Sequence, residues 1–300
     1  MEKGYPARTV LRICQVPRST YYYRLQHPER MQPVRPGRPI PGYSYDQSGD
    51  KVADKRIQRY IRKLIQGPDS SFGYRKLTVL LRRRYRLVIN KKKVYRICKE
   101  MLILLPQREQ VTRVPKRVAN NRIVTGANQL WQMDIKYGYV AGQRRHFYLA
   151  SIIDVFDRAI VAYHRGKACS KDDIILTLQK ALLKRSAHGP ISPVIRTDNG
   201  PQFTSHAFHA FCETAGIEHE RIPNQTPNKN AYIESFHSIL ERECYQRNCF
   251  ENYEEAFKEV DRYLHYYNWD RIHGSLNDWP PSEYLRLVMQ GAIKPRDIAL

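Results

Sequence analysis

The first part of the chain carries apolar residues at helical spacing, most clearly in residues 51–105. From Asp54 onward apolar side chains recur every three or four positions, with one interruption by Gly and Pro. Ser70 or Ser71 is expected to cap the helix after this interruption, and a third helix is expected after Asn90. The side chains expected to face inward are Ile57, Ile61, Leu64, Ile65, Tyr74, Leu77, Leu80, Leu81, Val94, Ile97, Cys98, Met101 and Leu102. The pattern predicts a three-helix domain.

A shorter helical pattern precedes this domain, in residues 1–27. It predicts a helix, a turn at residues 16–18 and a second helix capped by Ser19, an arrangement compatible with a helix-turn-helix. Residues 28–50 are rich in Pro and Gly, and residues 106–125 are polar, basic and aperiodic. We therefore expect linkers at these two places.

After residue 125 the pattern changes to β-branched and aromatic runs separated by turn residues. The expected elements are strands at 130–140, 145–156 and 158–166, a helix at 170–187 capped by Ser170, a strand at 193–198, a helix at 205–216, a strand at 217–222 and helices at 230–245 and within 250–276. This order predicts an α/β domain over residues 126–287, with a mixed five-stranded sheet flanked by helices and a C-terminal helix. Residues 288–300 are expected to form a tail.

Charge separates the same two parts of the chain. Residues 1–125 hold 30 basic and 8 acidic side chains, whereas residues 126–300 hold 21 of each, so the whole net charge of +22 lies in the first part. Such an excess is typical of proteins that bind a polyanion, and nucleic acid is the commonest one. Lys91, Lys92 and Lys93 begin a predicted helix, where cations oppose the helix dipole unless an anion lies there. A DNA phosphate would supply that anion; a solvated basic face is the alternative.

Other classes of protein fit the composition less well. No apolar run approaches the length of a membrane span, and the N-terminal residues lack the apolar stretch of a secretory signal. The six cysteines are scattered without a Cys-x-x-Cys pair, which favours reduced thiols over a zinc site. We expect a cytoplasmic protein.

Three acidic residues occupy positions that invite a chemical role. Asp134 lies within an apolar strand, and Asp198 ends another strand before an Asn-Gly turn. Glu234 lies one turn into a helix beside the apolar stripe of Ile233, Phe236 and Leu240, so we expect it to face the sheet. If the first and fourth strands are neighbours, the three carboxylates converge at one edge, and a divalent cation would offset their repulsion. Taken alone, Asp198-Asn199-Gly200 is equally good turn chemistry.

These acids carry a resemblance to a known family. Thirty-five residues separate Asp198 from Glu234, and with Asp134 upstream this resembles the D,D-35-E pattern of retroviral integrases and bacterial transposases, which have a ribonuclease H-like fold. The segments QLWQMDIKY, RTDNGPQFTS, NAYIESFHSILERE and YNWDRIHGSLNDWPPSEY together resemble the second-frame transposase of the insertion-sequence-three family. Before the core, VPRSTYYYR and FGYRKLTVLLRRRYRLVINKKKVYRICKEMLIL resemble that family as well.

The resemblance implies a metal-dependent enzyme acting on DNA. Asp134, Asp198 and Glu234 would bind two Mg²⁺ ions, with Mn²⁺ as a substitute, and would support strand cleavage at element ends and transfer of the 3′-OH into target DNA. The implied partners are terminal inverted repeats, target DNA, further copies of the chain, and the family's first-frame product as a fusion or a separate chain. The candidate DNA contacts are Arg18, Tyr21, Lys91, Lys92, Lys93, Arg96, Asn199, Lys229, Asn230 and Arg242.

Two departures and two alternatives accompany this prediction. Glu241 stands where relatives often carry Lys or Arg, and Lys229 where Asp is common. A phage or retroelement integrase is one alternative, although a zinc-binding front end is not visible; a non-catalytic DNA-binding regulator that keeps the fold is the other. We expect His237, one turn after Glu234, to be a surface or packing histidine. The alternative is a functional role, in contact with DNA or with the metal site. Asp154 is expected to serve a hairpin.

Overall fold

The computed structural model describes residues 6–14, 16–27, 41–106, 122–188, 191–222 and 230–299. Two compact units divide the chain, one formed by residues 1–44 and the other by residues 45–300. Residues 107–121, the larger part of the linker predicted over residues 106–125, and the loop of residues 223–229, which includes the predicted DNA contact Lys229, lie outside the described residues. The end of that predicted linker contains a short strand, β4 (Ile123–Val124).

The N-terminal unit contains the two expected helices, α1 (Ala7–Ile13) and α2 (Arg18–Gln26). The predicted cap is wrong, because Pro17 occupies the N-cap position and Ser19 lies inside the first turn of α2. Proline has a φ angle suited to this entry and offers no side-chain acceptor. Leu11 is buried, and α2 buries no residue, so this pair of helices has almost no core of its own.

The larger unit begins with the predicted helical domain, to which three short strands are added. Its elements are β1 (Tyr43–Asp46), which begins two residues before the boundary of the unit, β2 (Lys51–Ala53), α3 (Asp54–Gln66), the 3₁₀ turn η2 (Pro68–Ser71), α4 (Tyr74–Arg84), β3 (Leu87–Val88) and α5 (Lys91–Glu100). The strands form a sheet of order β2-β1-β3. The linker expected over residues 28–50 is therefore too long at its C-terminal end, where Asp46 accepts the backbone N–H groups of Ser48 and Asp50 and closes a turn.

The helix caps of this domain follow the prediction in one case and depart from it in another. The Asn90 side chain accepts the backbone N–H of Lys92 at 2.9 Å and caps α5 as expected. Ser70 and Ser71 do not cap α4, because they belong to η2 and Gly73 holds the N-cap position. Most of the predicted inward residues are buried or partly buried in one cluster. Leu102 is the exception: it follows the end of α5 with a φ of 56° and is 92% exposed.

The mixed sheet of the second domain has the predicted strands. Its elements are β5 (Leu130–Val140), β6 (Arg145–Asp154), β7 (Ile160–Gly166), α6 (Lys171–Arg185), the 3₁₀ turn η3 (Ser186–His188), β8 (Val194–Thr197), α7 (His206–Thr214), β9 (His219–Arg221) and α8 (Ala231–Glu243). The strand order is β7-β6-β5-β8-β9. β5, β6 and β7 pair antiparallel, whereas β8 pairs parallel with β5 and with β9. The predicted α/β class and five-stranded mixed sheet are confirmed.

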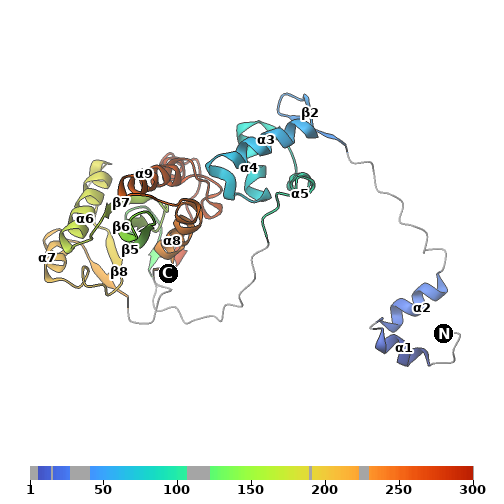
Figure 1. The fold of residues 1–300 in the computed structure, drawn as a ribbon, viewed down its shortest axis with the longest axis horizontal. Helices are drawn as coiled ribbons and strands as arrows, with labels where there is room; N and C mark the ends of the chain where they lie inside the picture. The colour runs from blue at the N-terminus through green and yellow to red at the C-terminus, as the bar shows by residue number, and fades with distance from the viewer. Residues whose placement is uncertain are drawn as a thin grey trace. The chain divides into compact units, whose positions relative to one another are not determined.

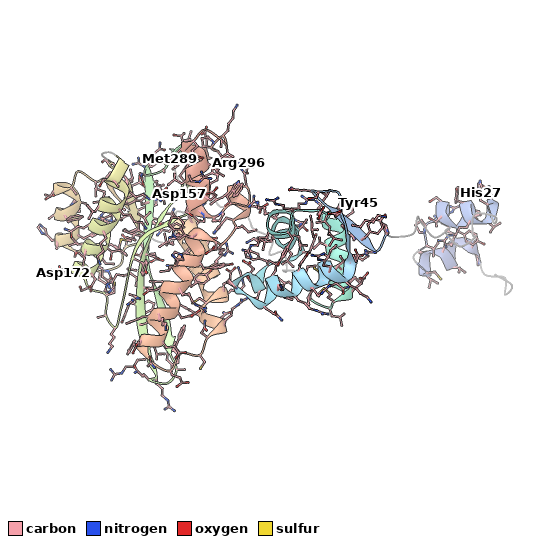
Figure 2. The ribbon with its side chains drawn as sticks, turned by 90° about the horizontal axis from the view of Figure 1, so that it is seen from above. His27, Tyr45, Asp157, Asp172, Met289 and Arg296 are labelled. Atoms are coloured by element: carbon pink, nitrogen blue, oxygen red, sulfur yellow. The ribbon has the colours of Figure 1, made fainter. Side chains whose placement is uncertain are left out.

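Helices cover both faces of this sheet. Ser170 caps α6 through a capping box with Asp173, as predicted. On one face α6 and α7 pack on Trp131 and Met133 of β5; on the other, α8 and α9 (Tyr253–Trp269) pack on Phe147 and its neighbours (Figure 1). Seen from above, the strands stand between these two helical layers (Figure 2). The sheet is thus buried on both faces, which explains the apolar runs in its strands.

The C-terminal residues add more structure than predicted. After α8 come the 3₁₀ turn η5 (Tyr245–Arg247), α9, the 3₁₀ turn η6 (Gly274–Leu276), α10 (Pro281–Met289) and β10 (Ile298–Ala299). The expected tail over residues 288–300 is therefore wrong, because β10 pairs antiparallel with β4 (Ile123–Val124). The helix expected within 250–276 ends at Trp269. No helix in the described parts of the chain combines the length and apolarity that crossing a membrane requires.

Contacts within the larger unit join the helical domain to the end of α9. The Tyr266 hydroxyl donates to the buried Asp69 carboxylate at 3.0 Å, and Lys76 Nζ donates to the Ile272 carbonyl at 3.0 Å. Ile272 itself belongs to the apolar cluster of the helical domain. Beside these contacts, a buried ion pair joins Arg271 to Glu243 of α8 at 2.7 Å.

Candidate active site where the parallel strand ladder ends

The register of β5 and β8 brings two of the predicted acids to the same level of the sheet. Gln132 of β5 is paired with Arg196 of β8 at the last position of this parallel ladder. Asp134 and Asp198 each lie two residues beyond that pair. Adjacent strands are about 4.8 Å apart, so these positions are close neighbours at the level where β8 ends, while β5 continues to Val140. The predicted adjacency of the first and fourth strands is confirmed.

Asp134 is held from two sides. Its Oδ1 accepts the backbone N–H of Ile135 at 2.8 Å, and its Oδ2 lies 3.4 Å from Nδ1 of His237 on α8. The side chain is 25% exposed, so one side remains open to solvent. In the antiparallel ladder Asp134 lies opposite Ser151 of β6. The carboxylate is thus fixed at the surface of the sheet while it stays accessible.

Asp198 belongs to a tight, exposed turn. Its Oδ1 accepts the backbone N–H of Gly200 at 2.9 Å, the turn chemistry expected from the sequence. A Cβ atom on residue 200 would lie 3.0 Å from that oxygen, so glycine lets the chain fold closely around the carboxylate. Asn199 is also exposed, and its Nδ2 donates to the Ile222 carbonyl at 2.6 Å.

A buried amide from β5 fixes the start of α8. Oε1 of Gln132, whose side chain is fully buried, accepts the backbone N–H groups of Tyr232 and Ile233, each at 3.1 Å. The first turn of a helix has N–H groups without helical partners, and Gln132 satisfies two of them. Glu234 is the next residue, so its backbone position depends on this anchor.

Glu234 does not face the sheet as predicted. Ile233, Phe236 and Leu240 form the buried stripe of α8, whereas Glu234 is exposed. Each residue advances a helix by about 100°, so the residue after Ile233 lies at the rim of the buried face. Glu234 therefore borders the site at the edge of α8, where solvent and a substrate have access.

The three acids influence one another electrostatically. The pKa of Glu234 is raised, mainly by partial burial and to a lesser extent by the negative charge of Asp134. The pKa of Asp198 is also raised by partial burial and by the charge of Asp134, although the hydrogen bond from the Gly200 N–H acts in the opposite direction. The charge of Asp134 contributes in both cases. In the part of the chain that the structure describes, no three His, Cys, Asp or Glu side chains lie close enough together to hold a metal ion.

Sequence reasoning missed one polar residue near these acids, Gln132, and left the role of another, His237, open. Gln132 was not identified, although a lone amide within the apolar strand WQMDI was a usable signal. His237 is a packed residue, as expected, and is 8% exposed, but it also contacts Asp134. Its other contact, Ser151, lies 86 residues away in the chain. Contacts over such distances leave no local pattern in the sequence.

The predicted DNA contacts in α5 fall into two groups. Lys91 and Lys92 are exposed at the N-terminus of the helix. Lys93 and Arg96 instead lie against Asp54 of α3, at 2.6 and 2.9 Å. The helix thus presents two exposed cations at its start and two that share an acidic partner.

The remaining predicted contacts are more varied. In the N-terminal unit, Arg18 is exposed above the Tyr22 ring, and Tyr21 packs edge-on against the same ring. Arg242 lies 3.1 Å from the buried Glu243. Asn230 is only 3% exposed, so its predicted phosphate contact is wrong in this conformation; it sits at the buried entry to α8.

Glu241, which departs from the pattern of relatives, has a specific partner. Its carboxylate lies 2.8 Å from Nζ of Lys136, two residues beyond Asp134 on β5. The carboxylate therefore neutralises a cation of the sheet next to the site.

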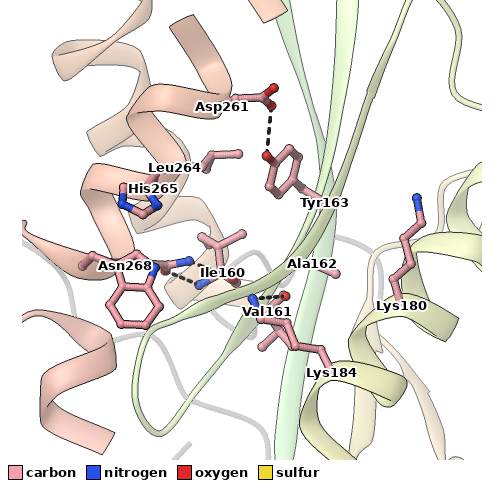
Figure 3. A pocket seen from close by; sticks show the side chains of 11 residues that line it. Ile160, Val161, Ala162, Tyr163, Lys180, Lys184, Asp261, Leu264, His265 and Asn268 are labelled. Atoms are coloured by element: carbon pink, nitrogen blue, oxygen red, sulfur yellow. Dashed lines mark hydrogen bonds between the residues drawn. The ribbon is translucent and has the colours of Figure 1, made fainter. Parts of the chain in front are cut away.

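A shallow hollow of about 320 Å³ lies away from the acids, between β7, α6 and α9 (Figure 3). Asn268 pairs with both backbone groups of Ile160 at 2.9 Å, and Lys184 Nζ donates to the Val161 carbonyl at 3.1 Å. These side chains form hydrogen bonds with backbone groups of the edge strand β7, so those groups are not available for pairing with another strand.

Comparison with known families assigns the two parts of the larger unit. Residues 124–227 and 215–281 match integrase core domain families, and residues 49–111 match an HTH-like domain family. The fold and the site thus define an integrase core preceded by an HTH-like domain.

The similar curated proteins come from bacterial insertion sequences. InsK of insertion sequence IS150 from Escherichia coli K12 is 26% identical over 95% of both chains. Transposase InsD of insertion element IS2 from Escherichia coli is 26% identical over 72% of this chain and 74% of its own. A 39.2 kDa protein of insertion element IS476 from Xanthomonas euvesicatoria is 32% identical over 71% of this chain, which spans 60% of that relative. The chain belongs to the insertion-sequence transposases.

Solved structures that match include the integrase catalytic core domain of HTLV-2 in complex with magnesium, in its trimeric form. It is 20% identical over 53% of this chain and 97% of its own, with a TM-score of 0.42.

Proposed function

We propose that this protein catalyses metal-dependent cleavage of DNA at the ends of an insertion sequence and transfer of the resulting 3′-OH into a second DNA strand. Asp134, Asp198 and Glu234 are the proposed catalytic residues. The observation that carries the proposal is the β5–β8 register, which sets Asp134 and Asp198 side by side, together with the raised pKa values of Asp198 and Glu234.

The three acids suit a hard divalent cation. Carboxylate oxygens are the ligands that Mg²⁺ prefers. Burial is the main cause of the raised pKa values of Asp198 and Glu234, and the charge of Asp134 adds to it; a cation would relieve that repulsion. We assign Asp134, Asp198 and Glu234 as the side chains that would hold two Mg²⁺ ions; in the described structure they do not lie close enough together to hold a metal ion, so binding requires them to approach one another. When bound, such ions supply Lewis acidity that activates an attacking water or 3′-hydroxyl and stabilises the leaving oxygen at a phosphate.

The protein's own contribution is to orient these groups. The Ile135 N–H fixes one oxygen of Asp134, and Gln132 fixes the first turn of α8 just before Glu234. The Gly200 N–H holds Asp198 at the turn. Pre-set carboxylates reduce the reorganisation required when DNA and metal arrive.

The basic front end is the proposed DNA-binding part. The exposed Lys91 and Lys92 stand at the N-terminus of α5, where N–H groups and positive charge favour a phosphate. The proposed partners are the terminal inverted repeats and target DNA, bound by several copies of the chain, with the first-frame product as a fusion or a separate chain.

Cleavage of a labelled element end tests the catalytic assignment. Asp134→Asn and Asp198→Asn should each lower the Mg²⁺-dependent cleavage rate by about 1000-fold or more, because losing a metal ligand removes several kcal/mol of transition-state stabilisation. DNA binding should persist. The matched control is Asp172→Asn, which removes an exposed carboxylate from α6 and should leave the rate unchanged.

Two results would contradict the proposal. Full cleavage by Asp198→Asn would remove this residue from the chemistry. A wild-type protein that binds element ends without any metal-dependent cleavage would instead be a DNA-binding regulator that keeps the integrase fold.

A further inference from the structure

His237 joins the Asp134 carboxylate to the neighbouring strand. Its Nδ1 lies 3.4 Å from Asp134 Oδ2, and its Nε2 lies 3.3 Å from the Ser151 hydroxyl. The ring is 8% exposed and Ser151 is fully buried, so the contact between His237 and Ser151 is shielded from water, while Asp134 keeps its open side. Ser151 lies directly opposite Asp134 in the β5–β6 ladder. The imidazole therefore bridges two cross-strand partners from the helix above them.

The donors and acceptors of this bridge define one arrangement of protons. An ionised carboxylate only accepts, so the hydrogen of a neutral ring belongs on Nδ1, toward Asp134. Nε2 is then the acceptor for the Ser151 hydroxyl. Both ring nitrogens are thereby used, and the partner of one fixes the role of the other. The two distances are long for hydrogen bonds, as is common for such contacts before substrate binds.

With Ile135, this bridge restrains both oxygens of the carboxylate. The backbone N–H of Ile135 donates to Oδ1 at 2.8 Å, and Nδ1 of His237 lies 3.4 Å from Oδ2, at the long limit for a hydrogen bond. Each oxygen keeps a second lone pair for a cation. A carboxylate fixed in this way loses little rotational freedom when it becomes a metal ligand, and partners of this kind strongly influence metal affinity.

Building on the proposed function, we propose that His237 is a positioning residue that aims Asp134 at the divalent ion, with Ser151 as its support. A histidine that merely fills space would require only the volume of its ring. A positioning histidine requires the N–H at Nδ1. The two roles therefore respond differently to substitutions that keep either the volume or the donor.

Two substitutions at this position separate the roles. His237→Asn places an amide nitrogen where Nδ1 lies and keeps the donor to Asp134, whereas His237→Leu keeps apolar volume and removes the donor. Ser235→Ala is the matched control, because Ser235 is an exposed residue of the same helix. Ser151→Ala removes the support and leaves the contact between His237 and Asp134.

The measurement is Mn²⁺ binding to the full-length chain on an element-end DNA, read from the electron paramagnetic resonance of free Mn²⁺. We expect His237→Leu to weaken binding about 10-fold or more, Ser151→Ala to weaken it less, and His237→Asn to stay within about 3-fold of wild type. Ser235→Ala should bind as wild type does. Strand-transfer rates at saturating Mn²⁺ should follow the same order.

Unchanged Mn²⁺ affinity in His237→Leu would overturn the inference, as would equal losses in the Leu and Asn variants. Should the Leu variant fail to fold by circular dichroism, His237→Gln replaces it, because its amide reaches the Ser151 side and not Asp134. Asp134→Asn, measured in parallel, distinguishes two failures. If Asp134→Asn also binds Mn²⁺ normally, the proposed function fails; if only Asp134→Asn loses affinity, the role of His237 alone is wrong.

Discussion

Replacing Gln132 by Met should damage the site more than the fold. Met has nearly the size and shape of Gln but offers no oxygen, so the backbone N–H groups of Tyr232 and Ile233 lose their shared acceptor. The N–H of the buried Ile233 has no route to water. An unsatisfied buried donor costs about 1–3 kcal/mol, so we expect about 2 kcal/mol of destabilisation. For a unit of this size that corresponds to a fall in Tm of about 4–8 °C.

The expected loss of activity is larger because Glu234 directly follows the two anchored residues. A catalytic group displaced by about 1 Å commonly costs about 100-fold in rate. We therefore expect strand transfer by Gln132→Met, measured well below its Tm and corrected for the folded fraction, to fall at least about 10-fold. Thermal unfolding by circular dichroism and strand transfer of a labelled 3′ end provide the two measurements.

A buried polar residue far from the site supplies the control. Thr177 of α6 is 1% exposed, and its hydroxyl donates to the Asp173 carbonyl at 2.6 Å. Thr177→Val should lower Tm and leave strand transfer per folded molecule unchanged. If Gln132→Met behaves like this control, Gln132 is only a structural residue. An unchanged Tm in Gln132→Met would refute the anchoring of α8 itself.

Two further predictions concern charges around the site and in the front domain. Burial alone would raise the pKa of Glu243, but the hydrogen bonds and charge of Arg271 outweigh it and lower the pKa to about 2. The ionised Glu243 therefore adds about 3 kcal/mol to the free energy of unfolding. This contribution is complete above about pH 4.5 and is lost as the pH falls toward 2. Urea unfolding should show Glu243→Gln less stable by about 3–5 kcal/mol at pH 7, with a weaker pH dependence between pH 3 and 5; an unaltered pH dependence would contradict this. Asp54→Asn removes the acidic partner that Lys93 and Arg96 share, so DNA affinity should rise at low salt and the slope of log K against log salt should steepen by up to about 1.8. An unchanged slope in fluorescence anisotropy would mean that neither cation reaches a phosphate.

The strands could be predicted from the sequence because their signals are local. Residues 130–140 were expected as a strand and form β5 with the same limits, since β-branched and aromatic runs end there at turn residues. Ser170 was recognisable as a cap because Asp173 completes the capping box. Ser19 failed as a cap although it is also a serine, because Pro17 begins the helix earlier. A cap depends on where the backbone enters the helix, which composition alone does not reveal.

The supporting contacts of the site could not be predicted because they are set by tertiary register. The acids themselves are recognisable from spacing and from their neighbours. Gln132 and its partners on α8 are about 100 residues apart in the chain, at separations of 100 and 101. Likewise β4 and β10 are two residues long each, too short for any periodic signal, and exist only because their segments meet.

The register between β5 and α8 has a simple geometric basis. Successive side chains on one face of a strand are about 6.6 Å apart, and four residues of a helix advance about 6 Å, so a helix running along a strand can repeat a contact at every second strand residue. The described contacts follow this rule. Gln132 binds the N–H of Ile233, Asp134 meets the residue four positions later, His237, and Lys136 pairs with the residue four further on, Glu241.

Three contacts at matched spacing fix α8 against sliding along β5 and against rotating about its axis. Glu234 lies between the first and the second contact, so its position relative to Asp134 is determined by the strand and does not depend on the exposed face of the helix. These contacts give a structural reason for an acid at position 241 in this chain. The third contact on β5 is made by Lys136, and a Lys or Arg at position 241 of α8 would repel it. The acid at position 241 is therefore matched in charge to a residue of the strand that carries Asp134.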